Sequence, residues 1–248
     1  IILYRHSSHI LQIVFAFIIY ISLFRIIALS GIRQQIAMGF SFIAFLFFQN
    51  KQYKKYFISI LIGSFIHISI LIFTLLYFSK YISGKKIKLI HFSVFLAIPL
   101  VIVFSNNIVL FMASFIKNDY YSVYGLKEAA GGGITYLTFV LLISLLCLFF
   151  LSKEYINKSH VNKTFYFNIP LLTFFSPLIL LDGSLIRIGQ YFSIYLLLII
   201  PFLFDFALKN KNYRNAVYVL CIMILIILSL SNPQDYFFFW ENAMSNYI

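Results

Sequence analysis

Long apolar segments separated by short polar links dominate the chain. Most are about twenty residues long, which is enough for a helix to cross a hydrocarbon layer of roughly 30 Å. A transmembrane β-barrel would show segments of about ten residues with alternating apolar and polar positions, which this sequence lacks. The pattern predicts an all-α fold, a polytopic transmembrane helix bundle with about seven or eight membrane segments. The predicted spans are 9–29, 34–50, 56–79, 89–105, 134–152, 165–181, 187–208 and 216–232.

The composition agrees with this pattern. Apolar residues make up 62% of the 248 residues, charged residues 10%, and the mean hydropathy is +0.95. A soluble fold needs a more polar exterior than this composition provides. We expect one polytopic membrane domain over residues 1–248, in contact with the lipid bilayer. Cys147 and Cys221 both lie inside apolar segments, so we expect no disulfide, metal site or cofactor.

The net charge of +12 comes from lysine clusters between apolar segments. This placement is typical of cytoplasmic loops and does not indicate nucleic-acid binding. Three lysine-rich links alternate correctly along the chain if all are cytoplasmic; they are 85–88, 153–163 and 209–214. The predicted outer segments are then the loop 106–133, the turn 182–186 and the C-terminal tail 233–248.

The third apolar segment conflicts with this topology. Lysines lie on both sides of residues 56–79, so a single crossing would place one cluster outside. The middle of the segment is polar, with Gly63, Ser64, His67 and Ser69. We favour a broken, re-entrant hairpin with its tip near His67, which membrane proteins tolerate where the backbone is buried or lines a wet cavity. The alternative is a straight crossing of 24 residues.

The hairpin would bring four polar groups to the outer face, namely Arg33, His67, Asp182 and Arg187. Arg33 and Gln34 lie at the start of the second span, and an arginine beside free helix N–H groups can bind a diphosphate. Arg187 can meet a second phosphate or a sugar. Asp182 can orient or deprotonate a hydroxyl group. The simpler alternatives are an arginine that reaches lipid headgroups and an Asp182–Arg187 ion pair.

Histidines and tyrosines supply the other candidates. His67 lies among apolar residues, where it can act as a base or merely hold helices together by a hydrogen bond. Tyr120 and Tyr121, in the loop 106–133, can form a platform for sugar rings, although the loop can equally be a passive connector. For the remaining histidines we expect solvated or interfacial positions near loops; these are His6, His9, His91 and His160.

Three short motifs together resemble the EpsG/Wzy-like family of bacterial polysaccharide polymerases. They are Ile-Arg-Gln-Gln-Ile-Ala at 32–37, Ile-Gly-Ser-Phe-Ile-His-Ile-Ser at 62–69 and Arg-Ile-Gly-Gln-Tyr-Phe at 187–192. The resemblance covers roughly residues 10–205 and lacks the family's N-terminal part. It implies that the catalytic carboxylate is either Asp182 or an upstream residue. It also places Tyr191 beside Arg187 among the substrate-binding residues.

The resemblance implies glycosyl transfer between undecaprenyl-diphosphate-linked glycans at the outer face of the cytoplasmic (inner) membrane. Partners would include a chain-length regulator and a flippase, as in O-antigen, capsule or exopolysaccharide synthesis. Arg33 and Arg187 would bind diphosphate or sugar, with His67 or Asp182 as the base. The main alternative is a lipid-linked glycan flippase or another polytopic transporter, although the sequence shows no pair of symmetric halves. A membrane acyltransferase would need a nucleophile–base pair that the sequence does not suggest.

Overall fold

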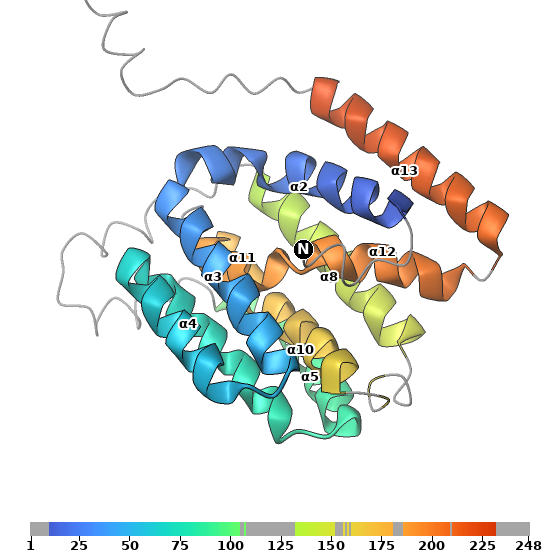
Figure 1. Cartoon of the computed structure of the whole chain (residues 1–248). Coiled ribbons are helices and arrows are strands. Elements are labelled where there is room, and N and C mark those ends of the chain that lie inside the picture. The colour runs from blue at the N-terminus through green and yellow to red at the C-terminus, as the bar shows by residue number, and fades with distance from the viewer. Residues whose placement is uncertain are drawn as a thin grey trace, which may run out of the picture.

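The computed structural model describes residues 10–104, 107, 132–151, 156, 158, 160–180, 186–208 and 210–231. Within this part of the chain every regular element is a helix (Figure 1). The elements are α2 (Ile10–Ser30), α3 (Ile32–Gln49), α4 (Tyr53–Ile66), η1 (Ile68–Lys80), α5 (Gly84–Val103), α8 (Gly132–Phe150), α10 (His160–Phe175), η3 (Ser176–Leu180), α11 (Ile186–Ser193), α12 (Leu196–Ala207) and α13 (Lys211–Ser231).

The apolar segments of the sequence all became helices, so the predicted all-α bundle is confirmed. Three of them are divided into two elements: α4 with η1, α10 with η3, and α11 with α12. Within the described residues, Gly84–Val103 and Arg187–Ala207 are long and apolar enough to cross a membrane. Pro99 and Pro201 lie inside these two helices. Membrane bundles tolerate proline inside a helix, because neighbouring helices can satisfy the freed backbone groups.

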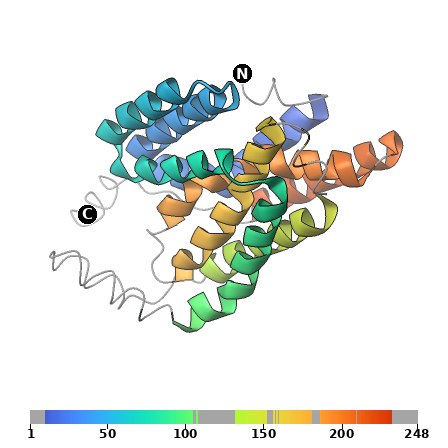
Figure 2. The ribbon, with the colours of Figure 1, turned by 90° about the horizontal axis from the view of Figure 1, so that it is seen from below.

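The third segment folds back on itself, as the lysine pattern predicted. Figure 2 shows α4 and η1 side by side, joined at one end. The Tyr56 hydroxyl on α4 donates a 2.5 Å hydrogen bond to the carbonyl of Phe73 on η1. Further from the turn, Lys80 Nζ lies 4.3 Å from the ring centre of Tyr53. The two arms are about 21 Å and 26 Å long, so neither alone spans a hydrocarbon layer of roughly 30 Å.

The turn of this hairpin is His67, whose backbone is extended (φ −151°, ψ 112°). Gly63 lies where the arms approach each other closely. A Cβ atom at that position would lie 2.6 Å from Cδ1 of Ile70 and 3.1 Å from Cβ of Phe40 on α3. Glycine therefore allows α3, α4 and η1 to pack together directly below the turn.

A buried aromatic cluster holds the hairpin against the rest of the bundle. Phe73 of η1 stacks on Tyr195, between α11 and α12, with ring centres 5.8 Å apart. The Tyr195 hydroxyl donates a 3.2 Å hydrogen bond to the Ser41 carbonyl on α3. Phe192 of α11 stacks on Phe175 at the end of α10, 5.7 Å away. The cluster fixes the hairpin tip relative to the starts of α3 and α11.

The expected position of His91 near a loop was wrong. His91 lies on α5 and is fully buried. Its Nδ1 lies 2.8 Å from the Tyr166 hydroxyl on α10, and its Nε2 lies 2.6 Å from the Ser144 hydroxyl on α8. Thr173 of α10 donates a further hydrogen bond of 3.0 Å to Ser144. Hydroxyl partners on two other helices, α8 and α10, satisfy the imidazole and allow it to be buried although it lies only eight residues into α5.

A second interhelical polar group joins α2, α12 and α13. Asp205 of α12 accepts hydrogen bonds from Gln12 of α2 and from the Tyr218 hydroxyl of α13, the latter at 2.9 Å. Arg214 Nε lies 3.5 Å from the same carboxylate. The acid and its neighbouring cation thus tie two peripheral helices to α12.

Two of the lysine-rich links, 85–88 and 153–163, meet the end of η1 at one end of the bundle. Lys163 Nζ, at the start of α10, donates a 3.2 Å hydrogen bond to the carbonyl of Lys80, where η1 ends. Lys88 Nζ on α5 donates one of 3.0 Å to the carbonyl of Leu151, just beyond α8. The hairpin turn at His67 lies at the opposite end of its arms. The bundle therefore has a lysine-rich end and, away from it, an end that carries the hairpin tip.

Candidate functional site

A pocket of about 560 Å³ opens at the hairpin tip. Three chain segments distant in sequence meet there: the start of α3, the turn between α4 and η1, and the start of α11. The lining residues are Gly31, Ile32, Arg33, Gln34, Ile66, His67, Ile68 and Arg187. The pocket therefore combines parts of all three motifs that the sequence singled out.

The two arginines make the pocket electropositive. Arg33 and Arg187 are both exposed, and none of the lining residues that the structure describes is acidic. Within the described part of the chain, neither guanidinium has a carboxylate within ion-pair distance, whereas Arg214 has Asp205. Two guanidinium groups that line one pocket and have no counter-ion among the described residues form a site suited to an anionic ligand.

A buried pair of glutamines holds the two arginines near each other. The Gln34 amide nitrogen donates hydrogen bonds of 2.9 Å to the Arg187 carbonyl and 2.6 Å to Oε1 of Gln190. Both glutamine side chains are almost completely buried. The contacts fasten the first turn of α3 to the first turn of α11, so Gln34 sets the relative position of Arg33 and Arg187.

A chain of hydrogen bonds orients His67. Nδ1 of the imidazole lies 2.5 Å from the Ser69 hydroxyl, and that hydroxyl donates to the Tyr191 hydroxyl at 3.1 Å. Because the Ser69 proton is used toward Tyr191, its oxygen is left to accept a proton from Nδ1. His67 then carries its proton on Nδ1. The lone pair of Nε2 has no hydrogen-bond partner within the described residues.

The surroundings of the imidazole favour its neutral form. His67 lies in the turn, outside both helical arms, and is half-buried. Burial lowers its pKa below the usual histidine range, and the positive charges of Arg187 and then Arg33 lower it further. A neutral imidazole with a free Nε2 can accept a proton.

The predicted site residues divide into three groups. Arg33, Gln34, His67 and Arg187 come together in one pocket. Tyr191 is fully buried and lies behind His67, which it reaches through Ser69. The others, Asp182, Tyr120 and Tyr121, lie outside the described residues.

Sequence reasoning did not single out the roles of Ser69 and Gln190. Both lie inside the quoted motifs, two residues after His67 and three after Arg187. Polar residues close to a candidate group in an apolar segment can indicate its hydrogen-bond partners, because a buried polar side chain needs a partner.

Comparison with known proteins gives one match. The model of the EpsG family matches residues 1–247, almost the entire chain and all three motifs. No curated protein and no solved structure shows significant similarity to the chain.

Proposed function

We propose that this chain polymerises lipid-linked repeat units. The chain belongs to the EpsG family and is thus a membrane protein of polysaccharide biosynthesis. The substrates would be undecaprenyl-diphosphate-linked oligosaccharides at the outer face of the bacterial cytoplasmic membrane. One observation carries the proposal: Arg33, Arg187 and His67 line a single pocket, and none of its lining residues in the described part of the chain is acidic. This combination provides cations for a diphosphate and a base for a hydroxyl group.

The pocket offers a diphosphate both charge and directed donors. Each guanidinium presents planar N–H groups that match phosphate oxygens. The first turn of α3 adds backbone N–H groups. Its N-cap residue is Gly31, which has no side chain that could cap them. These donors stabilise negative charge that grows on the diphosphate as its bond to the sugar breaks.

The reaction exchanges one carbon–oxygen bond for another. A sugar hydroxyl of one lipid-linked unit attacks the anomeric carbon of the growing glycan on its own carrier. The bond from that carbon to the diphosphate breaks, and the diphosphate leaves with the electron pair. Nε2 of His67 accepts the hydroxyl proton. The bound geometry of the two substrates supplies most of the remaining acceleration.

Lipid-linked intermediates distinguish polymerisation from transport. In a deletion strain, a missing polymerase leaves single repeat units on their carrier at the outer leaflet, and the intact gene restores long chains. Accumulation of these units at the inner leaflet would instead identify a flippase. Normal polysaccharide in the deletion strain would contradict both functions.

Cysteine labelling tests the proposed orientation. The positive-inside pattern places the lysine-rich end in the cytoplasm and the pocket outside. In a background without Cys147 and Cys221, Ile68→Cys should react with an impermeant maleimide on intact cells, because Ile68 lines the pocket and is 68% exposed. Lys54→Cys and Lys85→Cys should both react only after lysis. Labelling of either lysine position on intact cells would contradict the orientation.

A further inference from the structure

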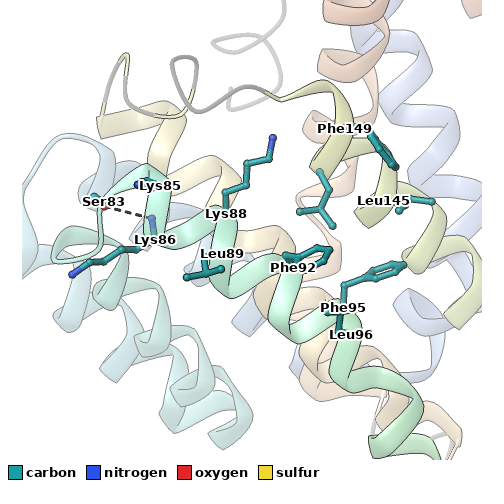
Figure 3. A pocket seen from close by; sticks show the side chains of 11 residues that line it. Ser83, Lys85, Lys86, Lys88, Leu89, Phe92, Phe95, Leu96, Leu145 and Phe149 are labelled. Carbon is teal, nitrogen blue, oxygen red and sulfur yellow. Dashed lines mark hydrogen bonds between the residues drawn. The ribbon is translucent and has the colours of Figure 1, made fainter.

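A second cavity lies between α5 and α8, at the lysine-rich end of the bundle. It is a groove of about 650 Å³. Figure 3 shows Phe92 and Leu96 of α5 facing Leu145 and Phe149 of α8 across it. Lys85, Lys86 and Lys88 lie toward one end of the groove, on the first two turns of α5. The groove is therefore apolar along its length and cationic at one end.

The cationic end is built into the fold. Ser83 caps α5 by accepting a hydrogen bond from the backbone N–H of Lys86, which fixes where the first turn begins. Lys88 is anchored by its hydrogen bond to the Leu151 carbonyl, so it bridges the start of α5 and the end of α8. Lys85 and Lys86 are exposed. Among the described residues that line the groove, none is acidic.

The outer wall of the groove faces the surface of the bundle. Leu89 and Leu96 of α5 are 64% and 58% exposed, on a helix long and apolar enough to cross a membrane. A ligand that enters from the side would place a chain along these apolar residues and its head beside the lysines. Lysines at this level of a membrane protein attract anionic headgroups, and basic pockets between helices bind them.

We propose that the groove between α5 and α8 is a binding site for an anionic phospholipid of the bilayer. One acyl chain lies along Phe92, Leu96 and Leu145, and the phosphate contacts Lys85 and Lys86. The bound lipid fills the space between α5 and α8 at the end where Lys88 joins them. The site lies away from the arginine pocket and stands independently of the proposed polymerase activity.

Native mass spectrometry of the purified full-length protein tests the proposal. The probes are palmitoyl-oleoyl phosphatidylglycerol and the corresponding phosphatidylcholine, titrated in detergent. We expect one phosphatidylglycerol to be retained per chain at concentrations where phosphatidylcholine is not. Lys85→Gln/Lys86→Gln should weaken that affinity about thirtyfold, from the loss of two headgroup contacts. Lys54→Gln/Lys55→Gln is the matched control, because it removes two exposed lysines that do not line the groove.

A second variant separates the acyl chain from the headgroup. Leu96→Trp narrows the groove without a change of charge and should also release the lipid, whereas Leu100→Trp, exposed on α5 but outside the groove, should not. Equal retention of the two phospholipids, or equal effects of the two double-lysine variants, would overturn the proposal. Displacement of phosphatidylglycerol by an equimolar amount of undecaprenyl phosphate would also overturn it, by assigning the groove to the carrier lipid.

Discussion

Two histidines within the bundle have opposite environments. His91 is enclosed by α5, α8 and α10, and both of its ring nitrogens lie within 2.8 Å of a hydroxyl group. His67 lies at the hairpin tip, where one nitrogen is held by Ser69 and the other is free within the described residues. His91 is thus a satisfied part of the core, whereas His67 has capacity left for a ligand.

The same contrast separates the arginines. Arg214 lies beside Asp205, within a group of side chains that joins α2, α12 and α13. Arg33 and Arg187 face a pocket with no carboxylate among the lining residues in the described ranges of the chain. Arg33 and Arg187 are exposed and have no counter-ion among the described residues of the pocket. An anionic ligand is the simplest source of the missing charge.

The largest difference in polymerisation activity is expected between the alanine variants of the two histidines. His67→Ala should lower polymerisation by about a hundredfold to ten-thousandfold, because it removes the proton acceptor. The amount of folded protein should stay the same, since His67 makes its side-chain hydrogen bond only to Ser69 among the described residues. Glycan length on gels and protein yield from the same cells measure the two effects. Long chains at the wild-type level would exclude His67 as the base.

The next effect comes from the pocket arginines. Arg33→Lys and Arg187→Lys keep the charge but lose the planar fork, so each should lower the rate by about a hundredfold or more and leave single repeat units. Arg214→Lys is the matched control and should retain long glycan. Equal chain lengths in all three variants would remove the proposed distinction between the arginines.

A smaller effect is expected in the pH dependence. The general base must be neutral, and the pKa of His67 is lowered by burial and by both arginines. Activity should therefore stay level as the pH falls toward the usual histidine range, and decline only below it. Arg187→Gln removes the larger of the two charge effects, which raises the pKa and shifts the decline of the residual activity to higher pH. An unchanged acid limb in this variant would mean that another group titrates.

The smallest effect on function is expected at His91. His91→Ala leaves the buried Tyr166 hydroxyl without its partner and opens a cavity, so it should lower the free energy of unfolding by about 1–3 kcal/mol. Activity per folded molecule should remain near the wild-type value. Thermal unfolding of the purified protein and its specific activity give the two numbers. A loss of specific activity without a loss of stability would place His91 in the functional machinery.

The helices and the hairpin were predictable from the sequence for a physical reason. Apolar length sets each membrane helix, and lysines on both sides of residues 56–79 favour a chain reversal between them over a straight crossing. Glycine and polar residues around His67 then mark where the reversal occurs. These signals are local or depend only on charge, so a single sequence carries them.

The pairings across the bundle were not predictable in the same way. The contact of Gln34 with Gln190 joins residues 156 positions apart, and Ser69 meets Tyr191 over 122 positions. The burial of His91 was not predicted, because its partners, Ser144 and Tyr166, lie on other helices. Apolar periodicity shows which residues are buried, but it does not show which buried polar groups meet.

The most direct test of the arginine pocket is the binding of undecaprenyl diphosphate to the purified full-length protein in detergent. We expect the wild type and Arg214→Lys to bind it with the same affinity. Arg33→Lys/Arg187→Lys should bind it roughly a hundredfold more weakly, because charge-assisted bidentate contacts are lost at both positions. Equal affinity of the double variant and the wild type would contradict the assignment of this pocket to the diphosphate.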